Sequence, residues 1–306
     1  LRGNVHSKGD RTPRQFIEVM TYEETPEFNQ KSSGRIQLAN WIASKHNPLT
    51  ARVIVNRVWF HLFGEGIVSS LDNFGHMGTP PRNLKLLDHL AVKFIDNSWS
   101  IKTLIRDIMQ SRTYQLSSRT NNESKKIDPE NTFLWKQNQR RLEAEAIRDS
   151  ILFVSGSLDK DKGGAAIKSG TKTEYGYSFN SKKRSIYYPV FRNTLPEIMQ
   201  VFDFADPNMV TGKRTTSSVP TQALYMLNNP FVIEESKKSA ERLIKEKLLN
   251  KSLEIEMAYR RVLSRNPTDK EKQILYNFLE LENESIEAWA NIFHSLFSSF
   301  EFRHTN

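Results

Sequence analysis

Apolar side chains recur every three or four positions through much of this chain, the spacing of helices that bury one face. In the first half, this spacing predicts helices over 34–44, 51–63, 83–97, 101–108 and 140–154. In the last third it predicts helices over 221–227, 230–249, 253–263, 270–282 and 286–297. Gly64 and Gly156 directly follow two of these segments, where glycine commonly ends a helix. We therefore expect a mainly α-helical protein.

Long polar segments separate the helices. Residues 119–130 and 203–219 are predicted to be loops, and residues 159–183 hold four glycines among many lysines and serines. Residues 184–190 are enriched in aromatic and β-branched side chains, which favours a short strand. The fold class we predict is mainly α, an irregular multi-helix domain with long loops and a minor β element near 184–190.

Four parts follow from this pattern. We expect an extended lead-in over 1–32, an N-terminal helical part over 33–158, a loop-rich insertion with a short strand over 159–219, and a C-terminal helical part over 220–306. A chain of 306 residues can build a sizeable core. We expect the last part to pack on the first helical part, so that the whole forms one composite domain.

Composition narrows the classes of function. Hydrophobic residues make up 38% and charged residues 26%, as in an ordinary globular protein. The net charge is +9, but the basic residues are scattered among acidic ones, so we do not expect nucleic acid as a partner. The absence of cysteine excludes disulfides, thiolate metal sites and covalent c-type haem attachment within the chain. No apolar run approaches the ~20 residues of a membrane-spanning helix. Because the sequence starts at Leu1 with no signal-like segment, we expect a piece of a longer protein.

The familiar sequence signatures of enzymes do not occur. We find no His-Glu-x-x-His, Gly-x-Ser-x-Gly, phosphate-loop or dinucleotide motif. Glu143 and Glu145 point apart on a helix and do not suit paired acid–base work. His61, His76 and His89 have no diagnostic ligand spacing, so no metal site is predicted. Whether the protein is an enzyme stays open at this point.

One candidate ligand-binding set lies on the 51–63 helix and the glycine-rich loop after it. The helix carries Arg52, Asn56 and Arg57, and the loop carries Asp72 and His76. These side chains could bind an anion or a sugar. The simpler alternative is a core helix whose arginines cover apolar surface with their aliphatic stems.

A second set of charges lies at the start of the 140–154 helix. Arg141, Glu145 and Arg148 fall at positions i, i+4 and i+7, where opposite charges can pair, and Arg140 and Asp149 flank them. Such a set is either a solvated ladder or a partly buried network. We predict a structural ion-pair hub in which Glu145 pairs with an arginine and is largely buried.

Several segments together resemble a known family. The resemblance lies in residues 47–59, the loop around Asp72, Phe74 and Gly75, and residues 99–102, 140–149, 184–187 and 219–223. The chain resembles the planctomycete PSD-type domain of unknown function (domain of unknown function 1553). Asn83 and His89 depart from the family pattern, which often has His and Trp there, and this speaks further against a histidine-centred metal site.

The resemblance implies the C-terminal module of an exported bacterial protein, in the periplasm or at the cell surface, with cytochrome-c-like modules upstream. Haem would then belong to an upstream module, and no cofactor is expected in this chain. Our leading hypothesis is a non-catalytic interaction or scaffolding domain whose partners are the upstream modules, a cytochrome or a cell-surface glycan. The alternatives are a hydrolase or carbohydrate-binding enzyme centred on residues 72–76, and a docking surface for electron transfer.

Overall fold

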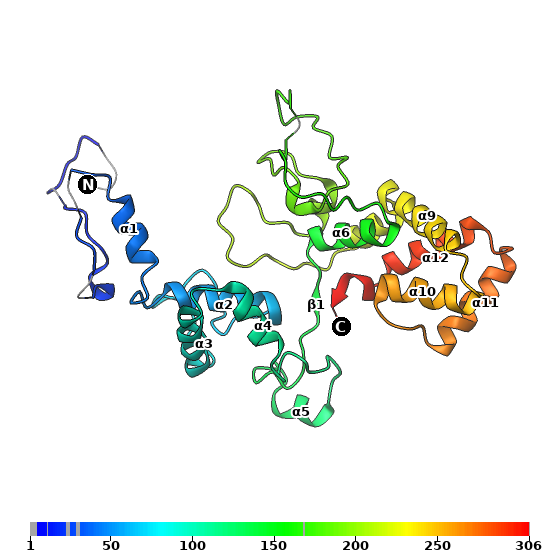
Figure 1. Ribbon diagram of the computed structural model, residues 1–306, viewed down its shortest axis with the longest axis horizontal. Helices are drawn as coiled ribbons and strands as arrows, with labels where there is room; N and C mark the ends of the chain where they lie inside the picture. The colour runs from blue at the N-terminus through cyan, green and yellow to red at the C-terminus, as the bar shows by residue number, and fades with distance from the viewer. Residues whose placement is uncertain (1–4, 11, 23–24, 29–30, 168, 306) are drawn as a thin grey trace. The chain divides into compact units, whose positions relative to one another are not determined.

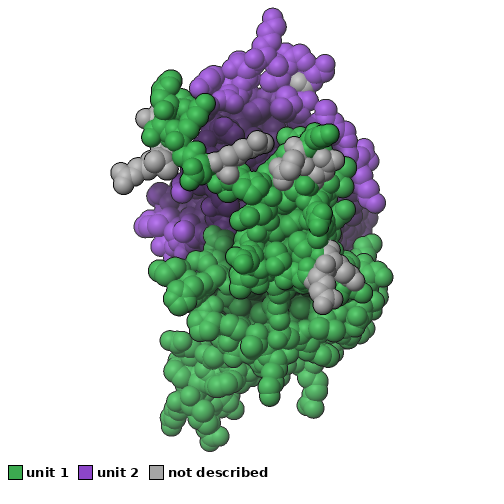
Figure 2. All heavy atoms as spheres, turned by 90° about the vertical axis from the view of Figure 1, so that its left-hand side faces the viewer, with its two compact units in different colours: residues 1–138 green, residues 139–306 purple. Residues whose placement is uncertain are grey.

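The computed structural model describes residues 5–10, 12–22, 25–28, 31–167 and 169–305. It divides the chain into two compact units, residues 1–138 and residues 139–306, which Figure 2 colours separately. Twelve α-helices and one two-stranded sheet occur in the described residues. The predicted mainly α-helical class is confirmed.

The described residues of the first unit form five α-helices, the last of which is short. They are α1 (Arg35–Ile42), α2 (Thr50–Phe63), α3 (Leu84–Asp96), α4 (Ile101–Met109) and α5 (Asn122–Ile127), preceded by the 3-10 turn η1 (Glu18–Met20). α2 packs against α3 and α4. The apolar stripes on these helices supply the core, which includes Val55, Phe63, Leu87, Phe94 and Leu104.

Local sequence signals explain most helix ends in this unit. Asn83 and Ser100 cap α3 and α4 through their side chains, and α2 ends at Gly64 with a φ of 82°. α2 begins at Thr50, one residue before the predicted start, and the Asn47 side chain accepts hydrogen bonds from the backbone N–H groups of Leu49 and Thr50. One expectation was wrong. The predicted 119–130 loop contains α5, because Asn121 caps a helical turn there.

The second unit contains the remaining helices. They are α6 (Ala144–Ser155), α7 (Glu197–Val201), α8 (Pro220–Asn228), α9 (Pro230–Lys245), α10 (Lys251–Leu263), α11 (Asp269–Leu281) and α12 (Ile286–Ser298), with the 3-10 turns η2 (Ser185–Tyr187) and η3 (Glu301–Arg303). α9 and α12 lie side by side, and α6 packs on α9 (Figure 1). Phe293 and Phe297, one turn apart on α12, are fully buried in the core that these helices share.

The predicted strand at 184–190 is wrong. Ser185–Tyr187 forms η2, because the Asp149 carboxylate on α6 accepts both the backbone N–H and the hydroxyl of Ser185. The two strands lie elsewhere: β1 (Arg140–Arg141) pairs antiparallel with β2 (His304–Thr305). The helix predicted from residue 140 therefore begins only at Ala144.

The predicted four-part organisation stays a prediction, although three facts bear on its parts. Part of the 1–32 lead-in, namely residues 1–4, 11, 23–24 and 29–30, lies outside the described residues. α6, which the sequence grouped with the preceding helices, supplies Ile147 and Ile151 to the core of the second unit. Residues 169–183 contain no helix, and an isolated bridge joins Lys183 to Asp159 in the segment after α6. Throughout the described ranges, no helix has the length and apolar character needed to cross a bilayer.

Candidate functional site

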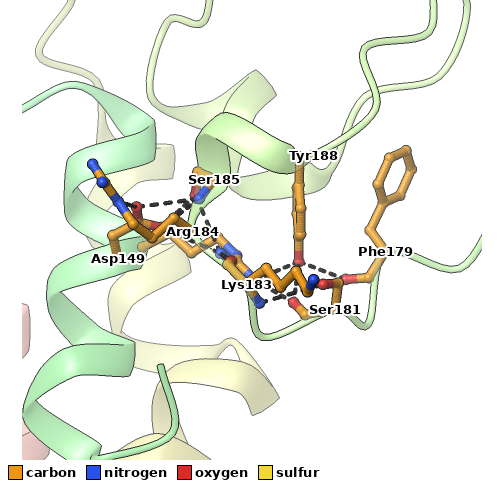
Figure 3. Close-up of polar contacts among 8 residues, drawn as sticks. Asp149, Phe179, Ser181, Lys183, Arg184, Ser185 and Tyr188 are labelled. Atoms are coloured by element: carbon orange, nitrogen blue, oxygen red, sulfur yellow. Dashed lines mark hydrogen bonds and ion pairs between the residues drawn. The ribbon is translucent and has the colours of Figure 1, made fainter. Parts of the chain in front are cut away.

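The charged residues of the second candidate set pair mainly with residues of distant loops, and Arg148 with Asp149 is the pair within the set that the described residues show. Glu145, Arg148 and Asp149 lie on α6, and Arg140 and Arg141 lie on β1. We call the contacts of Arg148 and Asp149 with residues 177–188 the α6 network (Figure 3).

Arg148 is the centre of the α6 network. Its side chain is only 4% exposed, and its Nη1 donates to the Lys183 carbonyl at 2.9 Å and to Ser185 Oγ at 3.2 Å. Nη2 donates to the Ser181 carbonyl and to the Tyr188 hydroxyl, the latter at 2.6 Å. The guanidinium carbon also lies 4.0 Å from the centre of the Tyr188 ring. One buried cation thus binds a whole loop to α6.

Asp149 and Tyr188 complete this network. Asp149 accepts from the Ser185 backbone N–H at 2.8 Å and from the Ser185 hydroxyl at 2.7 Å. The Tyr188 hydroxyl bonds to the carbonyls of Phe179 and Ser181, at 2.8 and 2.9 Å (Figure 3). Burial raises the pKa of Tyr188, so the phenol stays protonated near neutral pH. The loop conformation is therefore fixed by side chains that are fully engaged.

Arg141 and Glu145 each pair with a residue of the 203–219 loop. Arg141 binds Asp203 at 2.6 Å, and Arg214 binds both carboxylate oxygens of Glu145 at 2.8 and 2.9 Å. Burial works against the charge of Asp203, but hydrogen bonds from Ser217 and Arg141 outweigh it and lower the Asp203 pKa. Glu145 has the arginine partner we expected, although at 24% exposure its side chain is half-buried. Arg140 pairs through its backbone in β1.

A cavity of about 590 Å³ lies beside the α6 network in the second unit. Arg148 forms part of its lining, together with aromatic residues from the 177–188 loop and from α8 and α9. Its lining also includes Tyr177, Phe179, Lys182, Tyr188, Glu197, Tyr225, Asn229, Phe231, Glu234 and Glu235. Cavities of this size accommodate small organic ligands.

Glu235 and Tyr225 are two buried residues of the lining, and they differ in their hydrogen bonds. Glu235 is 2% exposed and accepts from Ser155 and from Lys238, the latter at 2.8 Å. Burial opposes its charge, but these hydrogen bonds, with one from Ser157, outweigh burial and lower the pKa of Glu235. Tyr225 is 8% exposed, and its hydroxyl makes no hydrogen bond within the described part of the chain. Burial, followed by the charge of Glu197, raises its pKa.

The first candidate set, in the first unit, does not line the cavity of about 430 Å³ that described residues of this unit form. Arg52 pairs with Asp88 at 2.6 Å. Asn56 is fully buried and exchanges two 2.9 Å hydrogen bonds with the Val68 backbone. Arg57, Asp72 and His76 are exposed. Asn56 thus fixes the turn after α2, and Arg52 fixes α2 to α3.

Metal-ligating side chains are dispersed. In the ranges that the structure describes, no three His, Cys, Asp or Glu side chains lie close enough together to hold a metal ion. His61, His76 and His89 are all exposed.

Sequence reasoning missed most of the cavity lining. Tyr225, Phe231 and Glu235 lie on two predicted helices, and the helical pattern did not mark them as lining residues. One signal was available, because aromatic residues alternate at 175, 177 and 179 in an otherwise polar, glycine-rich segment. Phe179 and Tyr177 of this run line the cavity.

The fold and the cavity define a mainly α-helical protein whose second unit holds a space for a small ligand. The family described as a protein of unknown function (DUF1553) matches residues 34–279, well over half of the chain. The chain belongs to this family. No curated protein and no solved structure matches it.

Proposed function

We propose that this chain is a non-catalytic binding domain, and that the cavity beside the α6 network is its binding site. The main support is the state of the charged groups around the cavity. Arg148 is occupied by four loop groups, and Glu235 by Ser155 and Lys238. These groups fix the shape of the cavity and have little capacity left to take part in a reaction.

The protonation equilibria support binding rather than acid–base chemistry. A general acid or base works best when its pKa lies near the working pH. The pKa of Glu235 is lowered by its hydrogen bonds, and burial raises the pKa of Tyr188 and Tyr225. Each shift moves the group away from neutrality, so these side chains keep one protonation state near pH 7.

We place this binding domain in a multidomain exported protein, at the periplasm or the cell surface. The support is family membership together with the resemblance to domains that follow cytochrome-c-like modules. In that setting the domain would hold an upstream module, a cytochrome or a cell-surface glycan, and any haem would belong to another module. Cell fractionation of the native host tests the location, and recovery of the protein only in the cytoplasm would contradict it.

The experiment that tests the binding function is a titration of the full chain followed by product analysis. Separate titrations would use neutral oligosaccharides, acidic oligosaccharides, basic peptides and inorganic phosphate, with binding followed by calorimetry. We expect one class to bind with 1:1 stoichiometry and to be recovered unchanged. Conversion of the bound compound, abolished by substitution of a cavity residue, would show an enzyme. No binding by any class would contradict the proposal as well.

The two alternatives receive no comparable support. A hydrolase centred on residues 72–76 requires side chains that converge, and Arg52 and Asn56 are held by Asp88 and Val68. Docking for electron transfer stays an untested prediction.

A further inference from the structure

We infer that the cavity beside the α6 network takes a neutral saccharide. This inference rests on the proposed binding function and specifies its ligand. Three properties of the lining carry it: aromatic rings on more than one wall, charges of both signs, and a tyrosine hydroxyl that has no hydrogen-bond partner among the described residues.

The aromatic rings come from segments far apart in the sequence. Tyr177 and Phe179 belong to the loop, and Phe231 lies at the start of α9. The rings of Tyr177 and Phe179 meet edge to face, with centres 5.0 Å apart. Exposed aromatic faces attract C–H groups that carry a partial positive charge, and a pyranose ring presents such C–H groups on its faces. The walls therefore suit a flat ligand with C–H surfaces.

The position of Phe179 is set by the α6 network. The Tyr188 hydroxyl bonds to the Phe179 carbonyl at 2.8 Å, and Arg148 Nη2 donates to the same hydroxyl at 2.6 Å. The backbone beneath the ring is thus anchored to α6 (Figure 3). Because this wall is already ordered, the binding of a ligand costs less conformational entropy.

The charges in the lining argue against an ionic ligand. Glu197, Glu234 and Glu235 would repel an anion, and Arg148 and Lys182 would repel a cation. A hydroxyl group tolerates both signs, because it donates to a carboxylate and accepts from an ammonium group. A neutral ligand with many hydroxyl groups fits this mixed lining better than a phosphate or an ammonium group does.

Specific hydrogen-bonding groups remain for such a ligand. Glu197 Oε2 accepts from the Asn229 side chain at 2.9 Å, and the Glu197 residue is exposed. A carboxylate in this position can accept from sugar hydroxyls while Asn229 holds it in place, as planar side chains in binding sites commonly do. Tyr225 is 8% exposed, and its hydroxyl has no hydrogen-bond partner among the described residues, so it can both donate to a ligand and accept from one.

The experiment is binding of the full chain to a glycan array with neutral and acidic glycans, followed by calorimetry with the strongest glycan. Two variants probe the lining: Tyr225→Phe removes only the hydroxyl, and Phe179→Ala removes one aromatic wall. Tyr175→Phe is the matched control, because Tyr175 is 69% exposed in the same loop and lies outside the lining. Unchanged thermal unfolding of each variant verifies that the fold is retained.

We expect neutral glycans to bind the wild type. Loss of one hydrogen bond in Tyr225→Phe should weaken binding roughly 2- to 10-fold. Loss of the aromatic wall in Phe179→Ala should weaken binding by about tenfold or more, with no change in Tyr175→Phe. Binding that is confined to acidic glycans, basic peptides or phosphate would overturn the saccharide inference and leave the binding domain intact. An absence of binding by every class would overturn both proposals.

Discussion

Replacement of Arg148 by methionine tests whether the α6 network stabilises the second unit. Methionine keeps much of the aliphatic bulk and removes every donor. The carbonyls of Ser181 and Lys183 and the Tyr188 hydroxyl then lose their cationic partner, while Asp149 keeps both hydrogen bonds from Ser185. The change therefore detaches the loop from α6 without removing the carboxylate that holds η2.

The expected cost follows from these contacts. A hydrogen bond from a charged donor contributes about 1.5–3 kcal/mol, but the exposed Ser181 regains water when the loop detaches. Adding these values for all the hydrogen bonds of Arg148 therefore overestimates the cost of the substitution. Removal of one partner from a buried ion pair costs about 3–5 kcal/mol. Because Asp149 keeps its hydrogen bonds from Ser185, we expect the cost of Arg148→Met to lie near the lower end of this range. A loss of about 3 kcal/mol corresponds to a fall in Tm of roughly 6–12 °C for a unit of this size.

The assay must report on the second unit alone. Pulsed hydrogen–deuterium exchange in increasing urea, read by mass spectrometry on peptides from α6 and α9, gives the unfolding free energy of that unit. Arg184→Met is the matched control, because Arg184 is 60% exposed and lies 3.9 Å from Asp149. We expect the control to cost less than about 0.5 kcal/mol. Equal unfolding free energies for the two variants would refute the structural role of Arg148.

Two further predictions concern the other charged and polar contacts. Asn56→Leu should cost the first unit about 2–4 kcal/mol, because it leaves the buried N–H and C=O of Val68 without partners; urea unfolding followed by tryptophan fluorescence measures this, and a loss below about 1 kcal/mol would contradict it. The hydrogen bond from Arg265 lowers the pKa of Glu271 to about 2, so its contribution is present above about pH 4.5 and is lost as the pH falls toward 2. With the Glu271 side chain 29% exposed, water reduces this contribution to about 1 kcal/mol. Thermal unfolding at several pH values should show a shallower acid slope in Glu271→Gln, and identical slopes would count against the pairing.

Helices were predictable from the sequence because their causes are local. The spacing of Leu87, Leu90, Ala91 and Phe94 defines the buried face of α3, and Ser100 caps α4 without help from distant residues. The same logic located all five helices of the last third to within a few residues. Where the backbone is satisfied by its own neighbours, pattern and capping are sufficient.

Segments whose partners are distant in sequence were not predictable. Arg140 and Arg141 continue the helical spacing of α6 but pair with His304 and Thr305 as a strand. The residues around Ser185 have the composition of a strand. The hydrogen bond from the Ser185 backbone N–H to Asp149 instead stabilises a 3-10 turn. For the candidate site, the sequence grouped Arg148 and Asp149 with Arg140, Arg141 and Glu145 in one ion-pair hub. It could not indicate Tyr225 or Glu235, because their surroundings depend on how α6, α8 and α9 pack together.

The pairing of β1 with β2 has a consequence for how the second unit assembles. Its register pairs Arg140 with Thr305, so nearly all the residues of that unit lie between the two paired strands in the sequence (Figure 1). Closing a loop of that length costs an unstructured chain about 4–5 kcal/mol of entropy, far more than two short strands can return. We therefore expect the ladder to form late, after the helical core has brought residues 140 and 305 together. Once formed, it holds residues 140 and 305 side by side, so the two ends of the described part of the second unit are fixed to each other.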